Sequence, residues 1–531
     1  MATKSKPRVL IVYCNTPMEP LVPLGVACLA STLEENDIEV RIFDNTLYEA
    51  IEDDEEHPEL DSTDDGDSQK SRTMSLAVKE VDFSSVGLVK SKNNMIDDFK
   101  AIVEEFQPDL IGLSCVELTL LTGLKLLESI KEKKIFNIVG GCVATFASEK
   151  VLSYDVTDSV CVGEGEQTIV QLSLAIENGD SLDNIPNFAY KKSKDTIHRS
   201  TNNFLIPTKD FGIPKFHFFQ KERIWRPMDG ILFRMIPIEF SRGCPYKCTY
   251  CSAPSYNDKF ADIGRWLRHK PMDQVITEIE YNIKKLNVEY FYFISETFLA
   301  IPKRMRKEFY ELYASIRLPF WFNTRPETIT EWDIENLENI GCHRISIGLE
   351  SGNEKFRYGL LRRDYTNGEM IRAAKLVSDS KIQVSVNNMI GFPDETREMI
   401  FDTIRLNKEF DLDSYSVSVF QPFIGTPLHK YCVEKNYWDK NRLLTRSFKT
   451  PVLNMPQLSP EEIRGLYRTF NLYILFDENR WPEIEQAEKF TPEGNEMFAK
   501  LCEEIAEQRE NPEIHVTDEV AVPMVSEVGT F

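Results

Sequence analysis

Three cysteines lie close together in the segment SRGCPYKCTYCSAP, where they can act as one group. Cys244, Cys248 and Cys251 are separated by four and three residues, and all of them fall on one loop after a strand-like run. Thiolates are the protein ligands of cubane iron–sulfur clusters. Three such ligands leave one iron with an open position, which distinguishes a catalytic metal site from a closed structural one. The spacing therefore favours a 4Fe-4S cluster with a catalytic role.

Zinc is the alternative metal for this loop. A structural zinc site needs a fourth Cys or His nearby, and no fourth cysteine follows the loop closely. The available histidine, His269, lies beyond a predicted turn and near the expected start of a helix. We therefore favour the cluster over a zinc ion.

Six strand-like runs follow from residue 236, with helical patterns between them: IPIEFS, VEYFYFI, FWFNT, HRISIGLE, IQVSVNNMI and DSYSVSVF. Alternating strands and helices build a parallel sheet, and barrels of this kind carry functional groups at the carboxyl ends of their strands. We expect a partial (β/α)6 TIM-type barrel over residues 233–450. A small helical C-terminal region over 451–531 follows it, with a frayed tail.

The pattern C-x-x-x-C-x-aromatic-C at the end of a first barrel strand resembles the radical S-adenosylmethionine (SAM) superfamily, with Tyr250 at the aromatic position. The resemblance implies that the open iron binds the amino and carboxylate groups of SAM. An electron from the reduced cluster then cleaves SAM to methionine and a 5′-deoxyadenosyl radical. It also implies an electron donor such as flavodoxin or ferredoxin.

Further segments resemble the family in the same order and imply SAM-binding residues. Glu296 in FISETF stands where family members place polar groups that face the substrate amine. Arg325 in FNTRPE is the candidate carboxylate partner, since guanidinium groups pair with carboxylates through two parallel hydrogen bonds. Glu350 in ISIGLESG would accept hydrogen bonds from ribose hydroxyls. Gly391 in NMIGFPDET belongs to a turn whose backbone packs on the adenine.

The N-terminal part also alternates between strand-like and helical patterns. Strand-like runs occupy residues 8–13, 38–43, 110–115 and 136–141 and the start of 159–166, with helices expected between them. This order is typical of a doubly wound parallel sheet, which binds ligands at the carboxyl ends of its strands. We expect a Rossmann-like domain over residues 1–185.

Glycines follow two of these strands, in Gly140-Gly141 and in Gly163-Glu164-Gly165-Glu166. Glycine lets a flat ligand approach the backbone closely, but such glycines also make plain strand-to-helix connections. The surrounding segments resemble the cobalamin-binding domain that precedes many radical SAM barrels. The resemblance implies that Ser114, Gly140 and Gly141 enclose the nucleotide tail of cobalamin, with Gly163 and Glu164 near the same pocket.

One feature departs from the wider cobalamin-binding fold. Many such domains carry a cobalt-ligating histidine after the first strand, but here that loop is CNTPMEPLVPLG and contains none. The radical methylases of this type commonly lack it, so the departure is compatible with the resemblance. Cys14, Cys115 and Cys142 follow three strands, and we interpret them as small buried thiols rather than as ligands of a second cluster.

Composition limits the partners and the cellular context. The net charge is −23 and the pI is about 4.9, which disfavours broad nucleic-acid binding. No run of about 18 apolar residues predicts a membrane span, and the N-terminus resembles a first strand rather than a signal peptide. We expect a cytoplasmic protein with an acidic disordered insertion at 52–73 and an ordered connector at 186–232.

The resemblance as a whole implies a cobalamin-dependent radical SAM enzyme. Its expected reaction is methylation of an unactivated carbon of a small-molecule or peptide substrate, through the 5′-deoxyadenosyl radical and methylcobalamin. Two alternatives stay open. One is a radical SAM oxidative cyclase of the cobalamin type, and the other is a methylthiotransferase-like enzyme without cobalamin.

Overall fold

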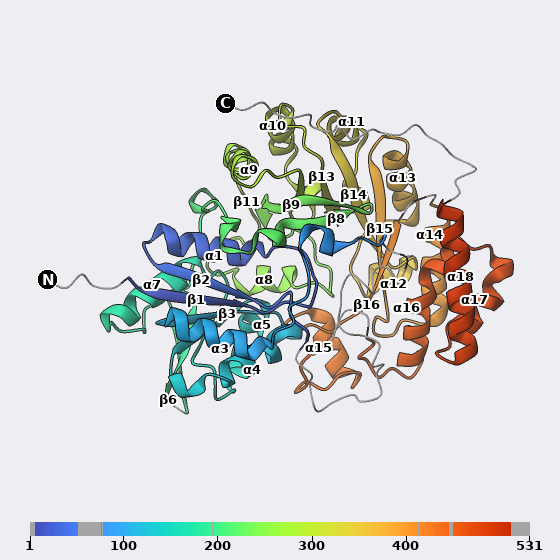
Figure 1. Ribbon diagram of the computed structural model, residues 1–531. Helices are drawn as coiled ribbons and strands as arrows, with labels where there is room; N and C mark the ends of the chain where they lie inside the picture. The colour runs from blue at the N-terminus through green and yellow to red at the C-terminus, as the bar shows by residue number, and fades with distance from the viewer. Residues whose placement is uncertain are drawn as a thin grey trace.

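The computed structural model describes residues 6–50, 76, 78–193, 195–410, 412, 414–444 and 450–510. The predicted acidic insertion at 52–73 and the last twenty residues lie outside this range. Two sheets with their covering helices form most of the molecule, and a group of helices follows the second sheet (Figure 1).

The N-terminal sheet has the strand order β2-β1-β3-β4-β5-β6-β7. Its first five strands are parallel, as predicted, and β6 and β7 add an antiparallel hairpin. The strands are β1 Arg8–Tyr13, β2 Glu39–Asp44, β3 Leu110–Ser114, β4 Phe136–Gly140, β5 Ser159–Cys161, β6 Phe188–Ser193 and β7 Thr196–Arg199. The hairpin lies in the segment that we expected to be a connector, so the sheet continues past residue 185.

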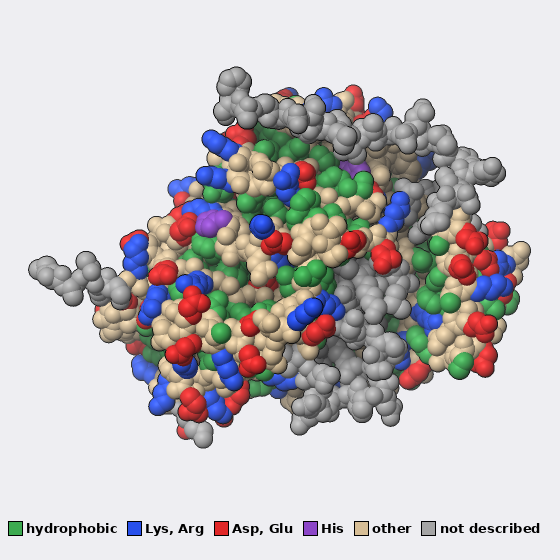
Figure 2. All heavy atoms as spheres, viewed as in Figure 1, with side chains coloured by type: hydrophobic (Ala, Val, Ile, Leu, Met, Phe, Trp, Pro, Cys, Tyr) green, Lys and Arg blue, Asp and Glu red, His purple; other side chains and the backbone are tan. Residues whose placement is uncertain are grey.

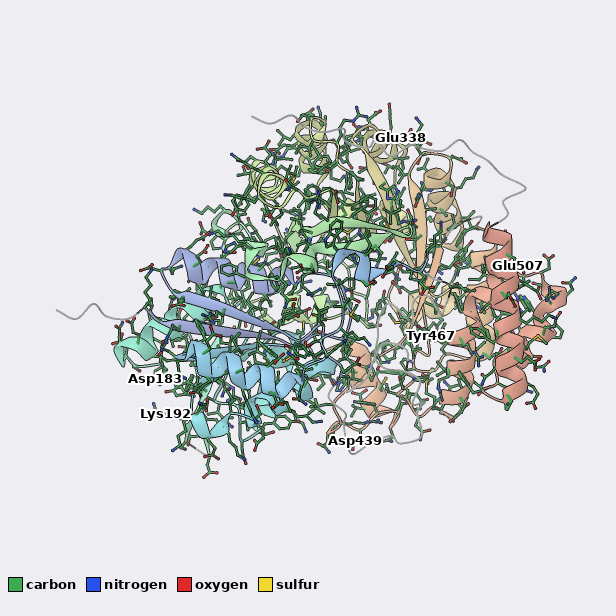
Figure 3. All side chains as sticks on the ribbon, viewed as in Figure 1. Asp183, Lys192, Glu338, Asp439, Tyr467 and Glu507 are labelled. Carbon is green, nitrogen blue, oxygen red and sulfur yellow. The ribbon has the colours of Figure 1, made fainter. Side chains whose placement is uncertain are left out.

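Helices cover both faces of this sheet, which confirms the doubly wound arrangement. They are α1 Leu24–Glu35, α3 Met95–Phe106, α4 Leu120–Glu128, α5 Cys142–Phe146, α6 Ser148–Leu152 and α7 Glu166–Asn178. Side chains alternate along a strand, so Val9 and Ile11 join the core under α1 and α7. Leu10 and Val12 join the separate core under α3 and α4. The exposed side of the hairpin carries the ion pair Lys192–Asp183, 3.3 Å long (Figure 3).

The second sheet has the order β16-β15-β14-β13-β12-β9-β8, and all six predicted strands are present and parallel. These are β9 Ile231–Glu239, β12 Tyr290–Ile294, β13 Phe320–Thr324, β14 Cys342–Glu350, β15 Gln383–Ile390 and β16 Ser414–Val419. The short strand β8 Trp225–Met228 adds an antiparallel edge at β9. The sheet curls into the partial barrel that the sequence predicts.

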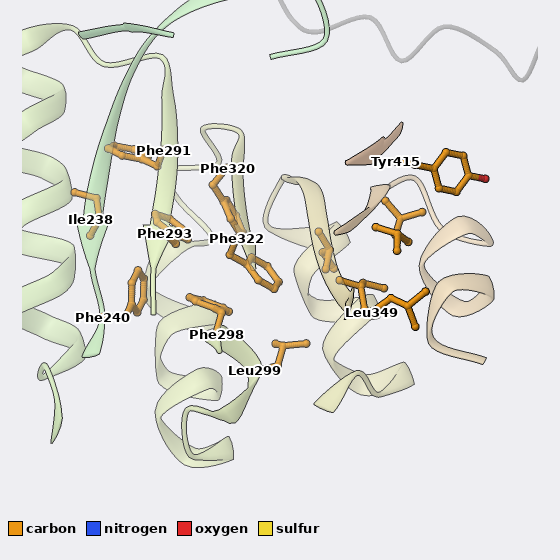
Figure 4. Packing of buried hydrophobic residues seen from close by; sticks show 14 of the residues in the cluster. Ile238, Phe240, Phe291, Phe293, Phe298, Leu299, Phe320, Phe322, Leu349 and Tyr415 are labelled. Atoms are coloured by element: carbon orange, nitrogen blue, oxygen red, sulfur yellow. The ribbon is translucent and has the colours of Figure 1, made fainter. Parts of the chain in front are cut away.

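Helices cover the outer face of this half-barrel and pack on an aromatic core (Figure 4). They are α9 Met272–Leu286, α10 Lys303–Tyr313, α11 Glu331–Asn339, α12 Glu354–Gly359, α13 Asn367–Ser378 and α14 Arg397–Lys408. The Phe309 ring of α10 meets Phe240 and Phe293 edge-on at 4.9 and 5.5 Å. Edge-to-face contacts of this kind add to the stability that burial provides.

The chain ends in the predicted helical region. Helix α15 Pro427–Glu434 precedes this region, within the range predicted for the barrel. The region itself contains α16 Pro460–Leu475, α17 Trp481–Ala487 and α18 Pro492–Glu510. Helix α16 begins at a capping box, in which Ser459 and Glu462 satisfy each other's backbone N–H groups. It packs on β16 and α14. Among the described residues, no helix is both long and apolar enough to cross a bilayer.

Two buried charged side chains connect the N-terminal sheet to the rest of the chain through hydrogen bonds. The Arg223 guanidinium donates to Asp44 at 2.8 Å and to the Pro20 carbonyl at 3.0 Å. Glu117, which follows β3, accepts the backbone N–H groups of Ile424 at 2.9 Å and Leu444 at 3.1 Å. The residues of the second pair lie more than 300 positions apart in sequence.

The Glu117 contact makes stability depend on pH. Burial raises the pKa of Glu117 to about 7, against the opposing effect of its two N–H donors. The folded-state pKa exceeds the unfolded one, so the stabilisation is complete at low pH and is lost as pH rises from about 4.5 through 7. The largest change in unfolding free energy from the titration of Glu117 is roughly 3 kcal/mol.

Thermal unfolding between pH 5 and 8 should show wild type losing stability relative to Glu117→Gln. The exposed Glu132→Gln serves as control, and parallel curves for wild type and Glu117→Gln would contradict the expectation.

Candidate functional site

The three cysteines lie on the loop that follows β9, between the short strand β10 Ser241–Arg242 and helix α8 Ala253–Lys259. Cys244 and Cys248 are buried, and Cys251 is half-buried. The loop is fixed at Thr249, whose hydroxyl donates to the Leu360 carbonyl at 2.6 Å. The Thr249 carbonyl accepts the N–H of Leu428 at 2.9 Å. Barrel elements on both sides therefore hold the thiols in place.

Two guanidinium groups approach one of these thiols. The Arg325 Nη1 lies 3.1 Å from the Cys248 Sγ, and the Arg363 Nη1 lies 3.8 Å from the same atom. Burial raises the pKa of Cys244 and raises that of Cys251 to about 12, and the neighbouring thiols contribute to both shifts. Fixed positive charge favours thiolates, and metal binding deprotonates them. The donor set therefore fits a buried, anionic metal–thiolate centre.

Among the described residues, no three His, Cys, Asp or Glu side chains come close enough to ligate one metal ion. A single zinc ion needs all of its ligands in one coordination sphere, within about 2.3 Å of the metal. In a cubane cluster each thiolate binds a different iron, so the sulfur atoms need not meet at one point. The geometry is therefore compatible with a cluster.

Arg363 connects several of the predicted residues, although the sequence patterns did not reveal it. Its Nη1 donates to the Tyr250 hydroxyl at 2.9 Å and lies 3.7 Å from the Glu350 carboxylate. Glu350 has a φ of +66°, and the β14–β15 register shifts beside it. Positive φ is strained for a residue with a Cβ, and such strain is concentrated at functional sites. Burial raises the pKa of Glu350, against the effect of Arg363.

Glu296 and Arg325 also contact the cysteine loop. The Glu296 Oε1 accepts the N–H of Gly243 at 3.1 Å, and burial raises the pKa of this carboxyl. The Arg325 guanidinium stacks on the Tyr246 ring at 3.8 Å and pairs with Glu327 at 2.5 Å. Both side chains are thus held in fixed positions before any ligand binds.

Gly391 lies in a turn that is closed by a buried carboxylate. Its φ is +79°, and its N–H donates to the Glu395 Oε2 at 2.6 Å. The next residue, Phe392, places its ring 5.6 Å from that of Tyr250. Burial raises the pKa of Glu395 to about 8, and its Oε1 has no hydrogen-bond partner in the described structure. Glu395 was not predicted as a site residue, although it stands in the motif GFPDET.

The second predicted site lies at the carboxyl edge of the N-terminal sheet. Ser114 and Gly140 are register partners at the ends of β3 and β4. Gly141 has a φ of +105°, and a Cβ there would overlap the carbonyl oxygen of Cys115. Val116 is 44% exposed beside them. This edge offers bare backbone and an uncovered apolar side chain, which fits a large flat ligand.

The two sites adjoin through helix α8, which directly follows the cysteine loop. The Tyr256 hydroxyl donates to the Cys142 Sγ at 3.4 Å. The Phe260 ring lies against Gly163, where a Cβ would come within 2.7 Å of it. Cys14 and Cys115 are buried as expected, but Cys142 is exposed, so that part of the expectation was wrong. Its position at the start of the short helix α5 keeps it at the open edge.

Glu164 lies in a buried ion-pair network. Its side chain is only 4% exposed, and its Oε1 lies 2.7 Å from Arg242 and 2.6 Å from Arg268. Its Oε2 accepts the N–H of Ile206 at 2.7 Å. Burial alone would raise its pKa, but the two guanidinium groups hold the pKa below its ordinary value. This carboxylate therefore joins the sheet to the barrel.

Comparisons with known families match both parts of the chain. Residues 238–406 match the model of the radical SAM superfamily, and residues 77–173 match that of the B12 binding domain. An uncharacterized methyltransferase of Pyrococcus horikoshii is 26% identical over 71% of this chain and 81% of its own length. Anaerobic magnesium-protoporphyrin IX monomethyl ester cyclase of Rubrivivax gelatinosus is 22% identical over 74% and 71%.

A solved structure has the same fold. It is the radical SAM methyltransferase TsrM of Kitasatospora setae, with cobalamin and a [4Fe-4S] cluster bound. The TM-score is 0.63 at 15% identity, and the match covers 94% of this chain and all of TsrM. The combination of a Rossmann-like sheet, a half-barrel and C-terminal helices is therefore a known architecture.

Replacing Glu164 distinguishes a structural role from a cofactor contact. Glu164→Gln leaves Arg242 and Arg268 buried without their shared counter-charge, so we expect a loss of about 3 kcal/mol in unfolding free energy. Cobalamin bound per folded molecule should not change. Denaturant unfolding and corrinoid absorbance of the purified protein measure the two quantities. Unchanged stability with loss of corrinoid would instead identify Glu164 as a ligand contact.

Proposed function

The chain belongs to the cobalamin-dependent radical SAM enzymes, and from this premise we propose that it is a methyltransferase acting on an unactivated carbon. The observation that carries the proposal is the contact of helix α8 with both sites. Tyr256 and Phe260 join the loop of three thiols to Cys142 and Gly163 at the glycine edge. A radical-generating site and a cobalamin site must adjoin if both are to act on one substrate carbon.

In this proposal Cys244, Cys248 and Cys251 hold the 4Fe-4S cluster. Arg325 and Arg363 offset the negative charge that the cluster and its thiolates bring into a buried space. Removing either cation would leave part of that charge uncompensated in a low-dielectric environment, which is costly.

The cosubstrate SAM would occupy the space between the cysteine loop and the strand ends of β12, β13 and β14. Glu296 would accept from the ammonium group, and Arg325 would pair with the carboxylate. Glu350 would accept from the ribose hydroxyls, at a position fixed by Arg363 and Tyr250. The backbone at Gly391 would lie against the adenine, in a turn closed by Glu395.

Cobalamin would lie at the edge formed by Ser114, Gly140, Gly141 and Gly163. When bound, the cluster with SAM supplies one-electron chemistry at the substrate carbon, and cobalamin supplies the methyl group. The residues of this chain bind and orient these groups, and they exclude water from the buried side of the site. We further propose a cytoplasmic location, a small-molecule or peptide substrate, and reduction by a flavodoxin or ferredoxin.

Two other reactions remain to be separated by experiment. The similarity to a protoporphyrin ester cyclase favours oxidative ring formation as the second candidate. A methylthiotransferase-like reaction without cobalamin is less favoured, because residues 77–173 match the B12 binding domain. Methyl transfer from SAM that carries a trideuterated methyl group should raise the product mass by one such group. A product that lacks the label would refute the proposed reaction.

Loss of one loop thiol should eliminate the cluster. Cys248→Ala removes one of three ligands and the sulfur that faces both arginines, so we expect loss of bound iron and of 5′-deoxyadenosine formation after anaerobic reconstitution. Iron analysis and chromatography of the nucleoside products measure these. Cys502→Ala, which alters a half-buried cysteine on α18, should retain both. Wild-type iron content and turnover in Cys248→Ala would overturn the assignment of the loop.

A further inference from the structure

The two faces of the half-barrel sheet differ sharply in composition. Phe291, Phe293, Phe320 and Phe322 point outward under the helices and are fully buried. The residues between them, such as Tyr292, Trp321 and Asn323, point to the inner face and are only half-buried. Burial alternates in this way when one face is packed and the other lines open space.

The strand registers assemble the inner face into polar rows. Asn323 pairs with Ser346, Ser346 pairs with Ser385, and Ser385 pairs with Ser414. One row further on, Asn387 pairs with Gly348 and with Ser416. The hydroxyls of Ser346 and Ser385 lie 2.7 Å apart, and Ser416 donates to Asn387 at 2.8 Å. An inner face this rich in hydroxyls and amides is suited to a polar ligand.

Two stacked aromatic rings lie on this inner face of the half-barrel sheet. The Tyr292 and Trp321 rings are stacked at 4.0 Å with an interplanar angle of 11°. The Arg226 guanidinium lies 5.3 Å from each ring centre, and the Asn323 amide donates to the Tyr292 hydroxyl at 2.7 Å. Polar and charged groups therefore surround a flat apolar surface.

One hydrogen-bond donor on this wall is unsatisfied. The Trp321 Nε1 is buried and has no acceptor in the part of the chain that the structure describes. A buried donor without a partner costs roughly 1–3 kcal/mol, and a ligand acceptor would recover this. Four residues further along the chain, just after β13 ends, Arg325 reaches the cysteine loop, so a ligand on Trp321 would lie roughly 13 Å along the strand from the proposed reaction centre.

We propose that the substrate is a polar small molecule with hydrogen-bond acceptors, bound with a flat or apolar part on the Tyr292–Trp321 pair and an acceptor on the Trp321 N–H. The inference rests on the proposed function only in taking this inner face as the substrate site. A wholly apolar ligand is disfavoured, because it would leave the Trp321 N–H without an acceptor.

The experiment uses full-length reconstituted protein labelled with 5-fluorotryptophan, with SAM present throughout. Loss of one ¹⁹F resonance in Trp321→Phe identifies the signal of Trp321. The probes are a methanol–water extract and a chloroform extract of the organism that carries this chain. We expect the Trp321 resonance to move with the methanol–water extract only. Movement with the chloroform extract alone, or with neither extract, overturns the proposal.

Fractionation of the active extract then gives a single compound for titration. Trp321→Phe keeps a six-membered aromatic ring but loses the pyrrole ring that carries the N–H, so we expect its Kd to rise at least about tenfold, the equivalent of one buried hydrogen bond. Trp332→Phe, on helix α11 of the outer face, should bind as wild type does. Equal affinity in Trp321→Phe overturns the proposed contact. Binding without methyl transfer would refute the methyltransferase and leave the substrate class intact.

Discussion

The negative charge on the thiolates of the cysteine loop constrains which side chains can surround that loop. An anionic centre can be buried only where fixed positive charge lies beside it, and both Arg325 and Arg363 reach the Cys248 sulfur. These arginines are themselves held, one by stacking on Tyr246 and the other by Tyr250 and Glu350. Arg325 follows β13 directly, and Glu350 at the end of β14 helps to hold Arg363, so the parallel strands β13 and β14 bring both cations to the same edge of the half-barrel.

A second consequence of this arrangement is that one short helix contacts both the half-barrel and the N-terminal sheet. Helix α8 starts two residues after Cys251 and reaches the open edge of the N-terminal sheet at Cys142 and Gly163. Glu164, Arg242 and Arg268 fix the same junction from the other side. A displacement of the N-terminal domain would therefore also displace the cysteine loop.

Local sequence patterns predicted the features that depend on interactions between residues close together in the chain. The alternation of apolar residues gave all six barrel strands and the five parallel strands of the first sheet, and the cysteine spacing gave the loop. Arg363, Glu395 and Arg223 were not predicted, because each acts through partners that only the tertiary fold brings near. The ion pairs of Glu164 were not predicted for the same reason, since Arg242 lies 78 residues away in the chain. The hairpin of β6 and β7 was missed because its polar residues do not resemble a core strand.

The two hydrogen bonds that Glu117 accepts from the backbone have a different kind of consequence. Its carboxylate recognises the main chain of Ile424 and Leu444 and neither side chain. Every residue type except proline presents the same N–H group, so these hydrogen bonds place no demand on the side chain at either partner position. A covariation analysis of related sequences would therefore find no partner position that changes together with Glu117.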